Sequence, residues 1–200
     1  GGMTRSGVTA TVEIYDPAAR TWSSGPGLVH ARHAHRALRI AGGKVLVVGG
    51  FGAVMGELPA RCELYHPVAN SWSPAGDLND ARADHSATLL ADGRVLVAGG
   101  SKQAGKLASV ESYEASSNTW VRRNDLSVAR LRHAAALLSD GRVLVVGGET
   151  GAVDLIDPAS QFQVRSVAGL GASRSEHVLL ALSLGRALVA GGQGVGGSFG

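Results

Sequence analysis

Short apolar runs separated by tight-turn residues recur along the whole chain. In one typical stretch an apolar run from His85 to Leu90 is followed by Asp92-Gly93 and then by a second run from Arg94 to Ala98. An Asp-Gly pair between two such runs is the signal of a tight hairpin. The second run is almost wholly apolar, as expected of a strand buried on both faces. The pattern predicts short antiparallel strands, and no segment shows a helical period over about ten residues or more.

These apolar runs belong to an internal repeat. The glycine pairs that end the second run begin at residues 1, 49, 99, 147 and 191, so the period is 44 to 50 residues. In the first three repeats a Glu-x-Tyr element, a Trp nine residues after the Glu, a His thirteen residues later and the next Gly pair fourteen residues after that keep step. In the fourth repeat Asp154 takes the Glu place, Ile156 the Tyr place and Phe162 the Trp place. Self-similarity at this period predicts a repeat architecture.

Each repeat accounts for four strands. The third strand carries the Glu-x-Tyr element, as at residues 62–65, and ends at an Asp-Pro turn or at its variant His66-Pro67. The fourth strand carries the Trp. Four antiparallel strands in each 44 to 50 residues make a propeller blade. We therefore predict an all-β fold, a β-propeller built from four four-stranded repeats, in a single domain over residues 1–200.

The repeated residues resemble those of a known family. The Gly pair, the Glu-x-Tyr, the Trp and the Arg-x-x-His before the first strand resemble the kelch motif, and residues 91–100 are similar to kelch-repeat proteins common in bacteria. The resemblance covers the whole chain and implies a propeller, usually of six or seven blades. The repeat frame begins and ends in the middle of a blade. We therefore expect the chain to be part of a six- or seven-bladed propeller; the alternative is that the two half-blades join into a closed four-bladed ring.

Length variation between repeats is concentrated in one loop. The step from the Gly pair to the Glu place is 12, 14, 12 and 7 residues, whereas the other steps are constant in the first three repeats. Because strand direction alternates, the loop between the second and third strands shares a face with the connection to the next blade. Loops that tolerate insertion commonly carry function. We expect a recognition surface, the variable-loop face, at residues 51–60, 101–108, 149–152 and from 193 onward.

One arginine precedes the His of each repeat by three residues, and these four are the candidate ligand-binding residues: Arg32, Arg82, Arg130 and Arg174. Next to the innermost strand, their guanidiniums would hold carboxylates or sulfates through paired hydrogen bonds. The alternative, which strict repetition favours, is that each Arg and His ties loop carbonyls between blades. The repeated glutamates and tryptophans are interpreted in the same way, as structural parts of the blades.

Charge and cysteine content exclude several kinds of partner and site. The net charge is +3, from 19 basic and 16 acidic residues, and the basic residues are dispersed, so no nucleic-acid partner is predicted. Cys62 is the only cysteine, which excludes an intrachain disulfide and a CxxC metal motif. His33 and His35 lie two residues apart, but no third ligand is evident nearby. We predict no metal, no cofactor and no membrane span.

The sequence therefore predicts a non-catalytic propeller that binds a protein or glycan ligand through its variable-loop face. One alternative is an enzyme of the sugar-isomerising kelch type or of the copper-radical type that resembles galactose oxidase. The copper chemistry needs a Cys crosslinked to a Tyr, a second Tyr and two His ligands, but all three tyrosines here occupy the repeating third-strand place. Another alternative is a purely structural spacer. The resemblance to bacterial kelch proteins implies export, so we expect a secreted or cell-surface location.

Overall fold

The computed structural model describes residues 1–54, 56–103, 105–194 and 197–198. Its elements in these ranges are short β-strands and two 3-10 turns, η1 (Ala41–Gly43) and η2 (Pro158–Ser160). None of these helical turns has the length and apolar character that a membrane span requires. The chain divides into two compact units, Gly1–Ala83 and Asp84–Gly200.

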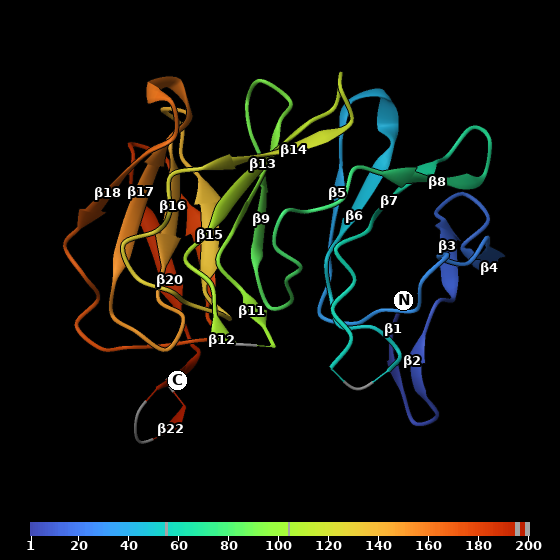
Figure 1. The fold of residues 1–200 in the computed structure, drawn as a ribbon, viewed down its shortest axis with the longest axis horizontal. Helices are drawn as coiled ribbons and strands as arrows, with labels where there is room; N and C mark the ends of the chain where they lie inside the picture. The colour runs from blue at the N-terminus through green and yellow to red at the C-terminus, as the bar shows by residue number, and fades with distance from the viewer. Residues whose placement is uncertain (55, 104, 195–196, 199–200) are drawn as a thin grey trace. The chain divides into compact units, whose positions relative to one another are not determined.

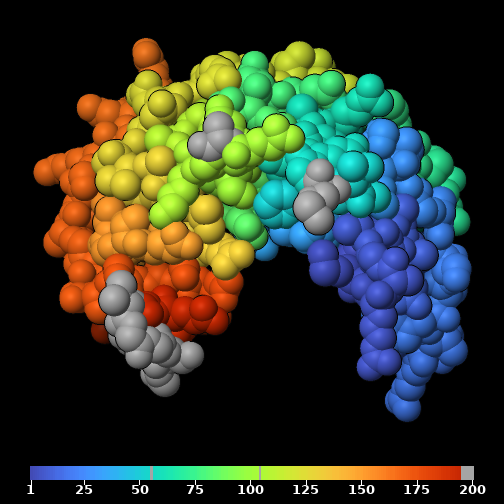
Figure 2. Space-filling model, turned by 60° about the horizontal axis from the view of Figure 1, so that its bottom comes forward, coloured from blue at the N-terminus to red at the C-terminus, as the bar shows by residue number. Residues whose placement is uncertain are grey.

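The first unit holds half a blade and one complete blade. The complete blade is a four-stranded antiparallel sheet in the order β5 (Arg36–Arg39), β6 (Val45–Val48), β7 (Cys62–His66) and β8 (Ser71–Ala75). Beside it lie two hairpins, formed by β1 (Gly2–Thr4) with β2 (Gly7–Thr9) and by β3 (Val12–Asp16) with β4 (Thr21–Gly25) (Figures 1 and 2). Strands β3 and β4 are the third and fourth strands of a blade, as the repeat frame predicts.

The second unit holds two complete blades and half of another. Its sheets, each in spatial order, are β9 (Ser86–Leu89), β10 (Val95–Ala98), β13 (Val110–Glu114) and β14 (Thr119–Arg123); then β15 (Ala134–Leu137), β16 (Val143–Val146), β17 (Val153–Asp157) and β18 (Gln163–Val167); and finally β19 (Val178–Ala181) with β20 (Ala187–Ala190). Two further hairpins follow Gly pairs, β11 (Ser101–Lys102) with β12 (Gly105–Lys106) and β21 (Gln193–Gly194) with β22 (Gly197–Ser198). The predicted all-β fold with four-stranded repeats is confirmed.

The core of the second unit lies between its blades. Leu96 and Ala98 on β10 pack with Val110 on β13 against residues of the next blade, among them Val145 and Ile156. Strand β10 is buried along its whole length, because one face of it packs on this core and it has a strand on either side in the sheet. Because neither face of β10 is exposed to water, its side chains need not alternate between apolar and polar, and this explains its unbroken apolar sequence.

The fourth repeat departs from the predicted register at one position. In the first three repeats the Tyr of the third strand pairs with the Trp of the fourth, as Tyr113 does with Trp120. In the fourth repeat Ile156 pairs with Val164, so Val164 and not Phe162 occupies the Trp place. The turn between these strands is one residue longer than in the other repeats, and it holds two left-handed residues, Gln161 at φ 54° and Phe162 at φ 59°. The extra residue turns the Phe162 side chain inward, where it is 1% exposed.

At the end of each blade opposite the variable loops, the turns are alike in both units, and we call this end the turn face. At the end of β3 the Oδ1 atom of Asp16 accepts hydrogen bonds from the backbone N–H groups of Ala18 and Ala19. At the end of β17 the Oδ1 atom of Asp157 does the same for Ala159 and Ser160. Aspartate stabilises such a turn by replacing a backbone acceptor. In the second unit η2, in orange, and the β11–β12 hairpin lie at opposite ends (Figure 1).

The second glycine of each pair is required by a close backbone approach. Gly148 has φ +91°, and a Cβ atom there would lie 2.7 Å from the carbonyl oxygen of Leu131 and 2.9 Å from the Cβ of His133. Gly141, in the turn before β16, has a similar φ of +86°, but nothing lies within 4 Å of a Cβ there. Replacement of these two glycines therefore distinguishes the effect of backbone strain from that of steric collision.

We expect Gly148→Ala to lower the free energy of unfolding well beyond the effect of Gly141→Ala. The left-handed conformation alone costs a non-glycine residue about 1–2 kcal/mol, and both variants bear that cost, but only Gly148→Ala adds a collision with backbone. Urea unfolding followed by circular dichroism measures both. Equal destabilisation would show that the second glycine of the pair is required for its positive φ only.

Candidate functional site

The first candidate arginine is a buried tie within its own blade. The guanidinium of Arg32 donates from Nη1 to the carbonyl oxygens of Gly49 (2.8 Å) and Arg61 (3.0 Å), and from Nη2 to Oε1 of Glu63 (2.8 Å). Glu63 in turn accepts from the backbone N–H of Val29 at 2.6 Å. Arg32 is fully buried and Glu63 is 3% exposed. The pair joins the segment that enters the blade to the ends of β6 and β7.

Arg130 repeats this arrangement in the second unit. Its Nη1 donates to the carbonyl oxygens of Gly147 (3.3 Å) and Ala152 (2.9 Å), and its Nη2 to Oδ2 of Asp154 (2.8 Å). Asp154 stands in the Glu place, one methylene shorter, and still accepts from the backbone N–H of Ser127. Burial lowers the pKa of Arg130 below its ordinary value, and Asp154 opposes that shift.

The other two arginines lie in comparable places. Arg82 is fully buried and donates from Nε to the carbonyl oxygen of Asp80. Arg174 is half-buried and donates from Nη1 to the carbonyl oxygen of Gly191 at 3.1 Å. A ligand would have to displace these protein bonds to reach the guanidiniums, and binding by the four arginines stays a prediction. The carbonyls that Arg32 and Arg130 hold belong to their own blades and not to neighbouring ones.

The repeated histidines lie beside the arginines. His133, just before β15, pairs through Nε2 with Oγ of Ser86 on β9 at 2.9 Å, so this contact does tie two blades together. In the first unit burial lowers the pKa of His35 to about 4, with the positive charges of the chain's amino terminus, Arg32 and Arg36 acting in the same direction. Burial and Arg174 also lower the pKa of His177. The imidazoles of His35 and His177 are therefore neutral at pH 7.

The tyrosines, tryptophans and Cys62 occupy repeated structural positions. The ring centroids of Tyr65 and Trp72 lie 5.1 Å apart, and those of Tyr113 and Trp120 lie 5.2 Å apart. Tyr65 donates its hydroxyl hydrogen bond to Oδ1 of Asn70 in the adjoining turn. Cys62 is a buried free thiol on β7. Over the described part of the chain, no three His, Cys, Asp or Glu side chains gather as a metal site would require.

Loops on the variable-loop face differ from blade to blade. In the first unit the loop after β6 is irregular, and the ring of its Phe51 lies 5.3 Å from that of His33, which precedes β5. Exposed Val54 follows in the same loop. In the second unit the corresponding loop forms the β11–β12 hairpin, and Nζ of Lys106 lies 2.6 Å from a carboxylate oxygen of Glu149.

A small polar cavity opens among the loops of the second unit. It has a volume of about 210 Å³ and is lined by Glu149, Ser173, Ser175, Gln193 and Gly194. Paired backbone hydrogen bonds of 2.8 Å between Ser175 and Gln193 form its frame. Glu149 has a left-handed backbone at φ 63°. Such conformations in residues other than glycine cost free energy and persist where the surrounding structure determines them.

The side chains of this cavity break the repeat. Ser173 and Ser175 flank Arg174, whereas alanines flank Arg82 in the second repeat, at residues 81 and 83. Glu149 directly follows its Gly pair, where earlier repeats have Phe51 and Ser101. The sequence analysis identified the loops but missed the two serines. Comparison of the residues that flank each repeated arginine would have found them.

Comparisons with known proteins agree with this architecture. Residues 32–79 match the family model described as Kelch motif. A solved structure titled "Structure of YjhT" superposes with a TM-score of 0.78 over 99% of this chain and 74% of that chain, at 15% sequence identity. No curated protein sequence matches the chain. The structural likeness at this identity shows the fold, and the motif match lies on the complete blade of the first unit.

We expect Asp154→Ala to destabilise the protein by about 3–5 kcal/mol, because it leaves the buried guanidinium of Arg130 without its carboxylate. Asp140→Ala is the matched control, because it breaks an ion pair with Arg142 in which both side chains are 44% exposed. Exposed pairs contribute little in water. Chemical unfolding of both variants measures the difference, and similar losses would contradict a structural role of the buried pair.

Acid should destabilise the protein between pH 6.5 and about 4 through His35. Its pKa falls from 6.5 to about 4 on folding, so the unfolded chain binds more protons in this window and stability decreases as the pH falls. We expect the wild type to lose its stability advantage over His35→Gln as the pH drops from 7.5 to 4.5. Thermal unfolding at a series of pH values measures this, and a gap that does not change with pH would contradict it.

Proposed function

We propose that this chain, which has a β-propeller fold of the kelch type and matches the kelch motif at residues 32–79, is a non-catalytic binding module that holds a carbohydrate or protein ligand at its variable-loop face. The observation that carries the proposal is the polar cavity at Glu149, Ser173, Ser175 and Gln193. Its side chains are absent from the corresponding places of the other repeats. Residues that maintain a blade recur with the period of the fold, whereas residues that serve one ligand need not.

The chemistry of the cavity favours a ligand rich in hydroxyl groups. Two serine hydroxyls and one amide can each donate and accept, and a carboxylate accepts only. The hydroxyl groups of a sugar likewise both donate and accept. Lys106 neutralises Glu149 in part, so a neutral ligand fits better than an acidic one. Polar groups placed around a concave site give a small ligand its orientation.

A protein ligand is the second candidate, favoured by the first unit. Phe51 and the exposed Val54 present apolar surface on the loop after β6. Aromatic side chains such as that of Phe51 are enriched in protein interfaces. An enzymatic role and a secreted or cell-surface location stay predictions, because they rest on the family resemblance.

The test is binding of the 200-residue chain to an array of neutral oligosaccharides, followed by calorimetry on those retained. We expect the double variant Ser173→Ala and Ser175→Ala to weaken binding by about thirtyfold, since it removes two hydrogen bonds worth roughly 1 kcal/mol each. The fold itself carries alanines at the corresponding places in the second repeat. Loss of binding is therefore not expected to reflect loss of folding.

Ser117→Ala is the control, because Ser117 is exposed in the turn between β13 and β14, on the turn face. We expect it to bind like the wild type. Equal affinity of the double variant and the wild type would reject the cavity as the binding site. Failure of the chain to bind any neutral oligosaccharide would reject the carbohydrate ligand and leave the protein candidate.

A further inference from the structure

A second concave site lies between the two complete blades of the second unit, on the turn face. It has a volume of about 530 Å³, and its walls include Arg94, Arg122, Arg123, Asn124, Gln161 and Phe162. Arg94 follows the turn into β10, Arg123 ends β14, and Gln161 and Phe162 belong to the lengthened turn between β17 and β18. The position is distinct from the polar cavity on the variable-loop face.

Two guanidiniums lie over one buried aromatic ring in this site. The Cζ atom of Arg94 is 4.6 Å from the centroid of the Phe162 ring, and that of Arg123 is 4.4 Å from it. Phe162 is 1% exposed, whereas the side chains of Arg94 and Arg123 are 26% and 23% exposed. A guanidinium stacked on a ring keeps its N–H groups in the plane of the ion, where they remain able to donate.

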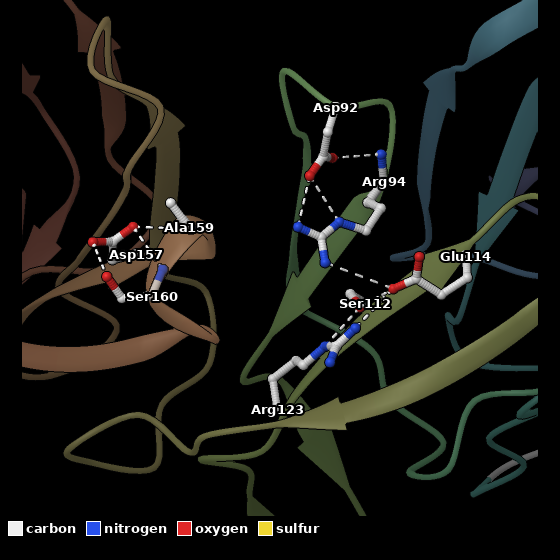
Figure 3. Close-up of polar contacts among 8 residues, drawn as sticks. All are labelled: Asp92, Arg94, Ser112, Glu114, Arg123, Asp157, Ala159 and Ser160. Carbon is white, nitrogen blue, oxygen red and sulfur yellow. Dashed lines mark hydrogen bonds and ion pairs between the residues drawn. The ribbon is translucent and has the colours of Figure 1, made fainter.

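Carboxylates and a buried hydroxyl hold these guanidiniums (Figure 3). Arg94 donates from Nε to Oδ2 of Asp92 at 2.8 Å, and its Nη1 lies 3.8 Å from Oε1 of Glu114. Arg123 donates from Nη2 to the same oxygen of Glu114 at 2.7 Å and from Nε to Oγ of Ser112 at 2.9 Å. The hydrogen bond from Arg94 lowers the pKa of Asp92, which therefore stays ionised. Both guanidiniums are thus fixed before any ligand arrives.

The charged residues that line the site are all basic, although acidic residues hold two of them in place. Among the described residues that line the site, three are arginines and none is acidic. Asp92 and Glu114 orient the guanidiniums but do not line the site. The amides of Asn124 and Gln161 add further donors to the wall. An anionic group entering the site would meet donors and positive charge, as carboxylate and phosphate sites require.

Three of the residues that build this site occur once among the repeats, whereas Arg94 and its bond to Asp92 recur as Arg142 and Asp140. Arg123 pairs with the first residue of its third strand, where the other blades have Gly25, Ala75 and Val167. Ser112, fully buried, stands where they have Ile14, Leu64 and Leu155. Phe162 reaches the site only because the turn of the fourth repeat has one extra residue. Three departures from the repeat converge on one cavity, and maintenance of a blade does not require them.

We propose that Arg94 and Arg123, stacked over Phe162, form a binding site for the carboxylate or phosphate group of a small anionic molecule. The ligand oxyanion accepts from the outer N–H groups of the two guanidiniums and from the amides of Asn124 and Gln161. Asp92, Glu114 and Ser112 are positioning residues that keep the guanidiniums in place. This site goes beyond the proposed function and uses other residues on another face.

Calorimetric titration of the whole chain with inorganic phosphate and with succinate tests the proposal, with sodium chloride at equal ionic strength as reference. We expect at least one of the two to bind, and the comparison tells phosphate from carboxylate. Arg123→Ala should weaken that binding by about tenfold or more, because it removes charge-assisted hydrogen bonds. The second repeat carries Ala75 at this position, so the blade accepts the change.

Arg142→Ala is the matched control. Arg142 pairs with Asp140 in the next blade, in the turn equivalent to that of Asp92 and Arg94. Its replacement by alanine removes the same charge from the same face. We expect its affinity to stay within about twofold of the wild type, because Arg142 does not line the site and exposed charges are screened. Equal losses in the two variants, or binding of neither anion above chloride, would overturn the proposal. If Arg123→Ala lowers the melting temperature, Arg123→Lys replaces it, and unchanged affinity in that variant overturns the proposal.

Discussion

The buried arginine–carboxylate pair is the interaction that holds together the complete blade of the first unit and the second complete blade of the second unit. Arg32 with Glu63 and Arg130 with Asp154 take a charged group out of water completely. Such burial is tolerated only when the ion is paired and its other donors are satisfied. In both pairs the guanidinium also reaches the two carbonyls at the ends of the second and third strands. One side chain therefore holds the entering segment, both strand ends and the carboxylate together.

This arrangement explains why loop length varies between repeats without loss of the blade. The arginine binds carbonyls at the two ends of the loop that joins the second strand to the third, so the residues between those ends are free to differ. Residues 51–54 and 56–60 belong to an irregular loop, β11 and β12 form a hairpin, and residues 149–152 are only a short link. The replacement of Glu63 by the shorter Asp154 keeps the pair at 2.8 Å. The buried parts of the blades in the second unit are therefore alike. The polar groups on its two faces differ.

Departures from the repeat mark both proposed sites. Ser173 and Ser175 replace the alanines that flank the arginine of the second repeat, and Ser112 and Arg123 replace aliphatic or small residues on the third and fourth strands of their blade. A buried serine under a half-buried guanidinium does not improve the packing of a blade, because the aliphatic residues of the other repeats fill the same place. A close comparison between repeats is therefore a physical test for function: what every blade shares supports the fold, and what one blade has alone requires another reason.

The sequence by itself determined the strands, the turns and the repeat frame. Apolar runs between Asp-Gly, Asp-Pro and Gly-Gly signals are local features, and local chemistry decides where short strands begin and end. It also located the arginines and the variable loops. The place of Phe162 was predicted wrongly, because counting residues cannot detect an extra residue that the turn absorbs with two left-handed conformations. Only the tertiary structure brought Glu149 to Gln193, and Arg94 to Arg123 and Phe162. These residues are far apart along the chain, and the packing of one blade on the next decides which of them meet.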